Sequence, residues 1–459
     1  LFLKNRMWAF VVVALLLVSG SAVRPTTAAG PPGHQQSPPL SQRPLRPPGP
    51  PPPPPKPPAQ PAPAPAPAPP STTVAPLYDF VFAQIGKAIR AANASNGLAL
   101  ELFRRVADQD NVFIAPFSVS TVLSMAYQGS AGRTAEEIAK VLGYDHSKDL
   151  RQFLLEGFKS TRALINVQTG PNELVDVNTM LVDTKINVVP EMKSKLQEYY
   201  GASVEQVNFQ RADTLKILDT LVEVKTKGHI KNAFGDREVP PNTLLILANV
   251  IFFKGVWEKQ FDPRYTTKDI FLNGGHKAYA IETDFMTMVD YHHYAYYPRL
   301  KLAALDLGYA GYQFRMTILL PDDPSRMGSI IDNIKVDDIR EIILDLEPAL
   351  VEVKLPRFKI TSQLNLKEYL QKLGMRSGFD QSLAELPYFT GDDSLYINEF
   401  VHQAVIEVNE QGTVAAAATV ASHATRSKVV KFHATSPFLF FIHDSRTGLI
   451  LFVGKVSKL

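Results

Sequence analysis

The sequence has 459 residues, 45% of them apolar and 20% charged, so most of the chain has the composition of a globular protein with a large core. It contains no cysteine, which excludes disulfides, thiolate metal sites and cysteine nucleophiles. The formal net charge is +3, but residues 1–76 hold six cations and no acid. The other 383 residues therefore carry −3, and we expect no nucleic-acid partner.

The first 22 residues have the pattern of a signal peptide. Lys4 and Arg6 precede an apolar run from Trp8 to Val18, and Gly20-Ser21-Ala22 supplies small residues for cleavage. The run is too short to span a bilayer, and no later run of 18 apolar residues occurs. The pattern predicts a signal peptide over residues 1–22 and a secreted, extracellular protein with no membrane partner.

A proline-rich segment follows. Of the 36 prolines in the chain, 23 lie between Pro25 and Pro76, which prevents this segment from burying a core. We expect residues 23–77 to form a solvated tail of polyproline II character that acts as a spacer. A docking site for a proline-binding module is the alternative.

Residues 78–459 contain no second proline-rich break and are predicted to form one domain. Leu98 to Val106 has the spacing of an amphipathic helix, and Pro116 is expected at the start of the next one. Thr134 and Glu137 have the spacing of a capping box, which predicts a third helix that ends at Leu142.

Strand patterns are denser in the second half of the chain. Asp444, Ser445 and Gly448 separate the last two predicted strands, as expected for a hairpin. Helices and strands occur in mixed runs without regular βαβ alternation, which predicts an α+β fold rather than a doubly wound sheet. The predicted strands are residues 244–253, 314–320, 351–355, 428–432, 438–442 and 449–453.

The sequence lacks the usual catalytic motifs. It has no G-x-S-x-G elbow, phosphate-binding loop, dinucleotide fingerprint or H-E-x-x-H helix, and we expect neither an enzyme nor a cofactor. His292 and His293 are the only adjacent histidines. Because neighbouring side chains on a helix or strand point apart, a metal site there needs other ligands.

The most informative segment runs from Glu410 to Ser427. Its alanine run suggests a helix, but it lacks the apolar face of a buried helix, and its threonines and valines weaken helix formation. Small side chains fill most of it, and a single long cation, Arg426, comes before the small residue Ser427.

This segment resembles the reactive-loop hinge of inhibitory serpins. Other stretches are similar to motifs of the same family in the same order, and together they cover nearly all of residues 95–459. They are Asn111-Val-Phe-Ile-Ala-Pro-Phe-Ser118, the run from Leu247 to Trp257-Glu-Lys, Leu355-Pro-Arg-Phe358, Phe400-Val-His402 and Pro437-Phe-Leu-Phe-Phe-Ile442.

The resemblance implies the serpin fold, with a large mixed central sheet, smaller sheets, surrounding helices and an exposed reactive-centre loop. It also implies suicide inhibition, in which the loop inserts as a new central strand before the acyl-enzyme hydrolyses. At ~3.3 Å per residue the 16 residues from Gln411 to Arg426 span roughly 53 Å, enough to carry a protease across the molecule.

Family positions can be carried over to single residues. Ser118, Asn249 and His402 match a polar cluster that governs opening of the sheet, although an ordinary buried histidine with satisfied neighbours fits as well. Trp257, Arg357 and Glu410 match the site where the loop first enters, with Arg357 expected to pair with Glu410. The hinge comprises Glu410, Gly412, Thr413, Ala415, Ala417 and Thr419; the departures from the family pattern, Ala115 and Gln411, are mild.

In the family's usual register the attacked bond is Arg426-Ser427, with Lys428-Val429 as the alternative. An arginine there implies a trypsin-like serine protease as the partner, held in a covalent complex by a monomeric inhibitor. A non-inhibitory serpin acting as chaperone or carrier is the alternative, but its hinge would usually be spoiled by bulky or charged residues.

Two further sequence features concern carbohydrate. Lys148, Arg151, Lys159 and Arg162 would form a basic helix face, which is either a solvated face or a glycosaminoglycan site. Asn93-Ala94-Ser95 is a glycosylation sequon.

Overall fold

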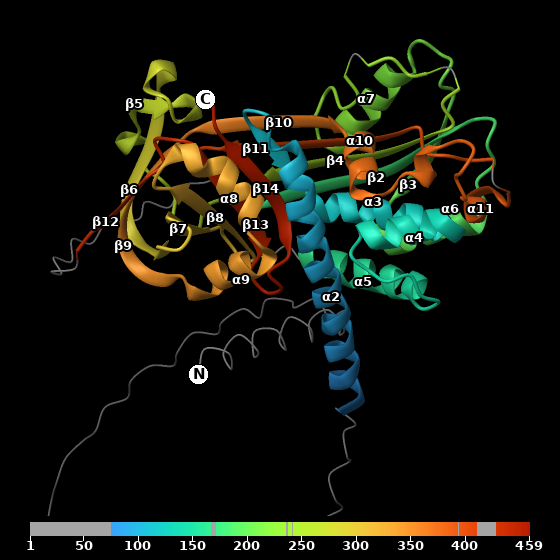
Figure 1. Ribbon diagram of the computed structural model, residues 1–459, viewed down its shortest axis with the longest axis horizontal. Coiled ribbons are helices and arrows are strands. Elements are labelled where there is room, and N and C mark those ends of the chain that lie inside the picture. Colours follow the sequence, from blue (N-terminus) through green and yellow to red (C-terminus); the bar gives the residue numbers. More distant parts are fainter. Residues whose placement is uncertain (1–74, 167–170, 236, 241, 393, 411–427) are drawn as a thin grey trace, which may run out of the picture. The chain divides into compact units, whose positions relative to one another are not determined.

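The computed structural model describes residues 75–459 except 167–170, 236, 241, 393 and 411–427 (Figure 1). The chain divides into two compact units, residues 1–81 and 82–459, and the following description concerns the second. None of the described helices is long and apolar enough to cross a membrane. The α-helices are α2 (Ala75–Val106), α3 (Pro116–Gly129), α4 (Gly132–Val141), α5 (Leu150–Ile165), α6 (Pro190–Tyr200), α7 (Thr214–Lys225), α8 (Met327–Asn333), α9 (Val336–Asp345), α10 (Lys367–Leu373) and α11 (Pro387–Thr390).

Two sheets organise these helices, and the fold is α+β, as predicted. The five-stranded sheet has the order β10 (Phe358–Asn365), β11 (Glu399–Val408), β4 (Leu245–Lys254), β2 (Glu173–Asp183) and β3 (Ser203–Val207). The nine-stranded sheet has the order β1 (Val112–Ile114), β14 (Ile450–Val456), β13 (Phe438–Asp444), β8 (Phe314–Pro321), β7 (Leu302–Gly308), β6 (Ala280–Tyr297), β9 (Glu347–Pro356) and β12 (Val430–His433), with β5 (Thr267–Leu272) beside β6.

The centre of the five-stranded sheet is a parallel pair. β11 and β4 run in the same direction, in a register from Glu399 opposite Ile246 to Ile406 opposite Phe253. Each is antiparallel to its outer neighbour, β10 or β2. We call the boundary between β4 and β11 the parallel seam.

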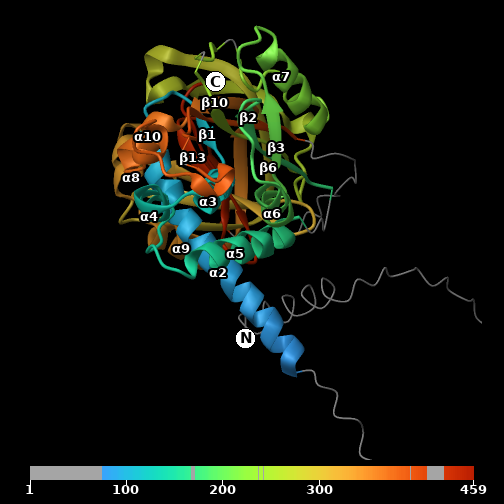
Figure 2. The same ribbon diagram turned by 90° about the vertical axis from the view of Figure 1, so that its right-hand side faces the viewer.

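The two faces of this sheet are covered by different helices. Along β4, Leu247 and Ile251 point into the main core, whereas Ile246 and Val250 pack in a second apolar cluster with Leu218 of α7. Figures 1 and 2 show α7 on one side of the sheet and the group α3 to α6 on the other. Both faces of β4 are buried, and this explains why its sequence is apolar almost without interruption.

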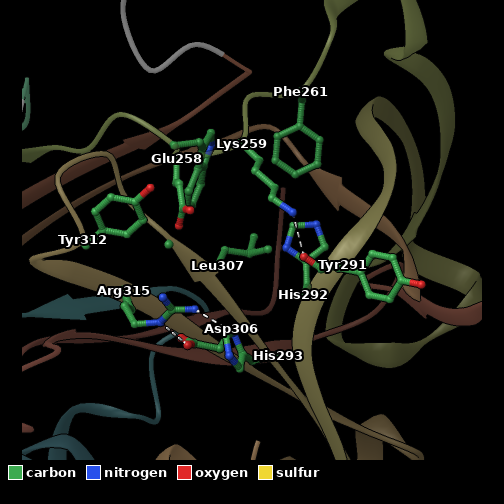
Figure 3. A pocket seen from close by; sticks show the side chains of 12 residues that line it. Glu258, Lys259, Phe261, Tyr291, His292, His293, Asp306, Leu307, Tyr312 and Arg315 are labelled. Atoms are coloured by element: carbon green, nitrogen blue, oxygen red, sulfur yellow. Dashed lines mark hydrogen bonds and ion pairs between the residues drawn. The ribbon is translucent and has the colours of Figure 1, made fainter. Parts of the chain in front are cut away.

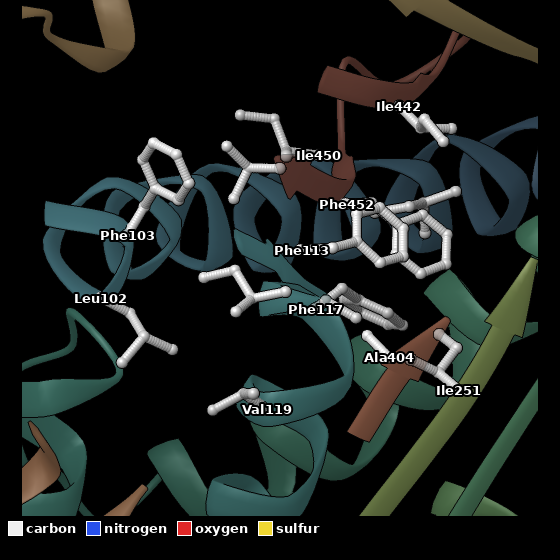
Figure 4. Close-up of a cluster of buried hydrophobic side chains, with 14 of the residues drawn as sticks. Leu102, Phe103, Phe113, Phe117, Val119, Ile251, Ala404, Ile442, Ile450 and Phe452 are labelled. Atoms are coloured by element: carbon white, nitrogen blue, oxygen red, sulfur yellow. The ribbon is translucent and has the colours of Figure 1, made fainter. Parts of the chain in front are cut away.

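The main core lies between the two sheets. All 14 residues of α3 are buried, because the helix contacts both β4 and β14. Phe113 of β1 stacks on Phe452 of β14 with ring centroids 4.9 Å apart. Figure 4 shows these rings with Phe117 of α3 and Ile251 of β4 in one cluster.

Two predicted helix boundaries were wrong. The helix expected over residues 98–106 begins at Ala75, since polar contacts hold its middle: Asn96 bonds the backbone of Gly448 and Ile450. Thr134 does not cap α4, because that helix already starts at Gly132. The Thr134 hydroxyl instead bonds Ser377.

Candidate functional site

The segment after β11 links the two sheets. β11 belongs to the five-stranded sheet, and description stops after Glu410; it resumes at Lys428, just before β12 pairs with β9 in the other sheet. The expected hinge and bond residues between these points lie outside the described residues: Gly412, Thr413, Ala415, Ala417, Thr419, Arg426 and Ser427. Of the alternative bond, Lys428 and Val429 are both exposed.

At the end of β11, Glu410 is held in place by an ion pair. Its carboxylate lies 2.5 Å from Nη2 of Arg357 and also accepts bonds from Arg357 Nε, at 2.8 Å, and from the Thr266 hydroxyl. Burial opposes ionisation of Glu410, but the bonds from Arg357 and Thr266 outweigh it and lower the pKa of the carboxyl. The structure therefore brings Arg357 and Glu410 together at the start of the loop.

Trp257 anchors the same point through the backbone. Its indole Nε1 donates to the carbonyl of Asn409 at 3.0 Å, and the ring stacks on Tyr309 with centroids 4.5 Å apart. Trp257 is only 4% exposed, so its N–H needs this partner. We call Trp257, Arg357 and Glu410, with their partner Asn409, the loop base.

A polar cluster crosses the parallel seam on its inner face. His402 of β11 lies directly opposite Asn249 of β4, and its Nδ1 is 2.7 Å from the Asn249 side-chain oxygen. The backbone N–H of Ala115 donates to His402 Nε2 at 3.2 Å, which places the imidazole proton on Nδ1. Both residues are fully buried, and burial lowers the pKa of His402 to about 3.

Two residues of this cluster were not predicted. Asn249 donates to Asn178 at 2.8 Å and to Asp176 at 2.9 Å, and both residues lie on β2. Ser118 joins the cluster through a bond to Asp176. Burial raises the pKa of Asp176 despite bonds from Asn178, Ser118 and Asn249. Asp176 and Asn178 alternate with apolar residues along their strand, and this sequence pattern could have identified them.

The adjacent histidines do not form a metal site within the described part of the chain. His292 and His293 are successive residues of β6, and the His292 ring contacts the sulfur of Met288 at 3.2 Å. Burial lowers the pKa of His292 to about 4, which keeps it neutral at physiological pH. Among the described residues, no group of three or more histidine, aspartate or glutamate side chains could hold a metal ion.

Most of the predicted basic face is used internally. Arg151 donates to the carbonyls of Tyr127, Gln128 and Ser130, Lys159 pairs with Glu198 at 2.7 Å, and Arg162 donates to Tyr199. Lys148 is exposed. The arrangement is a partnered helix surface rather than four free cations.

The sequon lies in the middle of α2. Asn93 is exposed and accepts a bond from Arg340 at 3.2 Å, whereas Ser95 is buried against Ser120.

The chain is similar to known proteins over most of its length. The family model described as Serpin (serine protease inhibitor) matches residues 93–459. Intracellular coagulation inhibitor 1 of Tachypleus tridentatus is 31% identical over 81% of this chain and 90% of its own length. Leukocyte elastase inhibitor A of Rattus norvegicus is 33% identical over 80% and 99%. The solved structure of native protease nexin-1 with heparin has 25% identity and a TM-score of 0.72, and covers 81% of this chain and 99% of its own.

These names correct the expectation of a secreted, extracellular protein, which was wrong. Two relatives are named intracellular coagulation inhibitors 1 and 2. The expectation depended on an apolar run behind two cations, which is a pattern of composition alone. That segment lies outside the described residues.

Proposed function

This chain belongs to the serpin family and is a protease inhibitor rather than an enzyme, and we propose that it traps a trypsin-like serine protease that attacks the Arg426-Ser427 bond. The observation that carries the proposal is the parallel seam, whose strand β11 continues directly into the loop. In this proposal the loop inserts into the seam once it is cleaved.

The direction of the strands supports insertion. A chain that leaves β11 and folds back beside it runs antiparallel to β11, and therefore antiparallel to β4 as well. One parallel contact is then replaced by two antiparallel ones. Because parallel pairing is slightly less stable per residue, and because a whole strand of hydrogen bonds is added, the inserted form has the lower free energy.

Opening the parallel seam breaks the backbone ladder that pairs Glu399 to Ile406 of β11 with β4, and in this proposal the inserted strand replaces those bonds on both sides. It also breaks the side-chain bond between His402 and Asn249, and a typical net hydrogen bond contributes only about 0.5–1.5 kcal/mol. The family's sheet-opening role for Ser118, Asn249 and His402 is therefore retained as a proposal. Asp176 and Asn178 are added to it, since they bond Asn249 from β2.

The loop composition fits burial in the seam. The residues proposed to face the interior, Thr413, Ala415, Ala417 and Thr419, are small and uncharged, so none of them adds the cost of a buried unpaired charge. This favours an inhibitor over a chaperone or carrier.

We propose Arg426 rather than Lys428 as the residue after which the protease cleaves the loop. Val429 is followed at once by Val430, the first residue of β12, which pairs with Val351 of β9. A protease that attacks after Lys428 would have to work next to an ordered strand, whereas Arg426 is two residues further away. The arginine would reach the acidic base of a trypsin-like specificity pocket.

The remaining assignments are also proposals. We divide the chain into a proline-rich spacer over residues 23–77 and an inhibitor domain over residues 78–459, acting as a monomer. Because three of the four cations of the basic helix surface bond to neighbouring residues, we propose inhibition without a glycosaminoglycan.

Incubation with trypsin tests the proposal. The purified protein should form a complex of the summed mass that survives boiling in detergent, because the acyl bond is trapped. Arg426→Ala should abolish this complex, and the matched variant Lys428→Ala should retain it. Cleavage of the parent without any complex would contradict the inhibitory mechanism, and loss of the complex in Lys428→Ala alone would move the bond to Lys428-Val429.

A further inference from the structure

A cavity of about 290 Å³ lies beside the loop base and has no part in the mechanism proposed above. It is enclosed by the segment after β4, by β6, and by the turn between β7 and β8 (Figure 3). The residues that line it are Trp257, Glu258, Lys259, Phe261, Tyr291, His292, His293, Asp306, Leu307, Gly308, Tyr312 and Arg315.

Aromatic side chains form much of the cavity wall. Trp257 and Phe261 come from the segment after β4, Tyr291 from β6, and Tyr312 from the turn before β8. Figure 3 shows the rings of Phe261 and Tyr312 on opposite sides of the open space. The faces of such rings carry partial negative charge and attract cations.

Most of the charges around the cavity are already matched. The Lys259 ammonium donates to Asp290 at 2.9 Å and to the Tyr291 carbonyl at 3.0 Å. Arg315 forms an ion pair with the buried Asp306. His292 is neutral, since burial lowers its pKa to about 4.

Glu258 is the exception. Within the described part of the chain its carboxylate makes no hydrogen bond or ion pair, and in Figure 3 it points into the open space between Tyr312 and Leu307. It lies directly over Gly308, where an added Cβ would come within 2.5 Å of Glu258 Oε2. Glycine at this position thus leaves room for the carboxylate, which is exposed to solvent at the edge of the cavity.

We propose that this cavity is a binding site for a small organic cation, an ammonium group attached to a flat apolar body. Glu258 binds the ammonium group and the aromatic wall binds the body. The occupant contacts Trp257, whose indole N–H holds the Asn409 carbonyl at the loop base. The site is a separate property of the protein and does not depend on the protease specificity proposed above.

The test uses three ligands with one body and different charges: phenethylammonium, 2-phenylethanol and 3-phenylpropionate. Binding is followed by the fluorescence of Trp257 in the full chain carrying Trp8→Phe, because Trp8 and Trp257 are the only tryptophans. The ammonium should bind about tenfold more tightly than the alcohol, as expected for one charge-assisted hydrogen bond, and the carboxylate should bind least.

Glu258→Gln should remove the preference for the cation and leave binding of the alcohol within about twofold. The matched control, Glu136→Gln, changes an exposed carboxylate of α4 outside the cavity and should keep the preference. No binding of any ligand, equal binding of all three, tighter binding of the carboxylate, or an unchanged preference in Glu258→Gln would overturn the proposal. Each outcome can be read whether or not the protein traps trypsin.

Discussion

The two sheets of this protein differ in how their inner strands are paired. In the nine-stranded sheet, β13 is antiparallel to both β14 and β8, and Phe113 of β1 stacks on Phe452 of β14 and on Phe440 of β13. In the five-stranded sheet the centre is a parallel pair bridged by His402 and Asn249. We propose that the loop enters at the centre of the five-stranded sheet, where the hydrogen bonds between β4 and β11 can be replaced by bonds to the inserted strand.

The largest effect is expected in the nine-stranded sheet. Phe452→Ala removes a fully buried ring and should lower the free energy of unfolding by about 3–5 kcal/mol. Chemical denaturation measures the change, and Tyr279→Ala, at a residue that is 67% exposed, should cost less than about 0.5 kcal/mol. If the two variants lost similar amounts of unfolding free energy, the packing of Phe452 in the nine-stranded sheet would not be a main source of stability.

The seam should respond to acid more than the rest of the protein. The pKa of His402 is about 3 when folded and about 6.5 when unfolded, so the unfolded state binds more protons between these values. Stability from neutral His402 is therefore complete above pH ~6.5 and decreases as the pH falls toward 3. From pH 7 to pH 5 the loss should be about 2 kcal/mol.

His402→Gln isolates this contribution, because the other titrating groups, including His292 and Asp176, are present in both proteins. Acidification favours folding through Asp176, whose pKa is raised, and thus partly offsets the His402 effect in the parent. The parent should lose more stability than His402→Gln between pH 7 and pH 5. Denaturation curves that shift equally with pH would show that His402 is not buried in the neutral form.

The smallest effect is expected at the loop base. Glu410→Gln removes the charge that pairs with Arg357, but the Arg357 side chain is 43% exposed and solvent screens the pair. We expect a loss of at most about 1 kcal/mol in unfolding free energy. Asp213→Asn, which removes an exposed ion pair with Arg211, should behave similarly. A loss several times larger at Glu410 would make the loop base a main source of stability.

Sequence patterns predicted the sheets better than the helix ends. Apolar runs and a turn were sufficient to predict β4 and the hairpin of β13 and β14, because a buried strand has a run of apolar residues that is visible in the local sequence. The spacing of apolar residues identified only the stretch from Leu98 to Val106 as helix, whereas α2 begins at Ala75. Tertiary bonds from Asn96 to the chain near residue 450 overrode this local pattern.

The candidate site was predictable only in part. Asn249 and His402 were identified through family motifs, and the structure places them opposite each other. Asp176 and Asn178 were missed, since their contact with Asn249 depends on the register between β2 and β4, which are far apart in the chain. Local sequence does not encode such a register.

The melting temperature of the loop-cleaved protein tests the central claim most directly, namely that the parallel seam accepts the loop. After cleavage at Arg426, the parent should melt well above its intact form, because an added strand brings new hydrogen bonds and buried side chains. Cleaved Thr413→Arg should gain much less, since an unpaired arginine would enter the sheet at a cost on the order of several kcal/mol. Equal melting temperatures for the cleaved and intact parent would contradict the account.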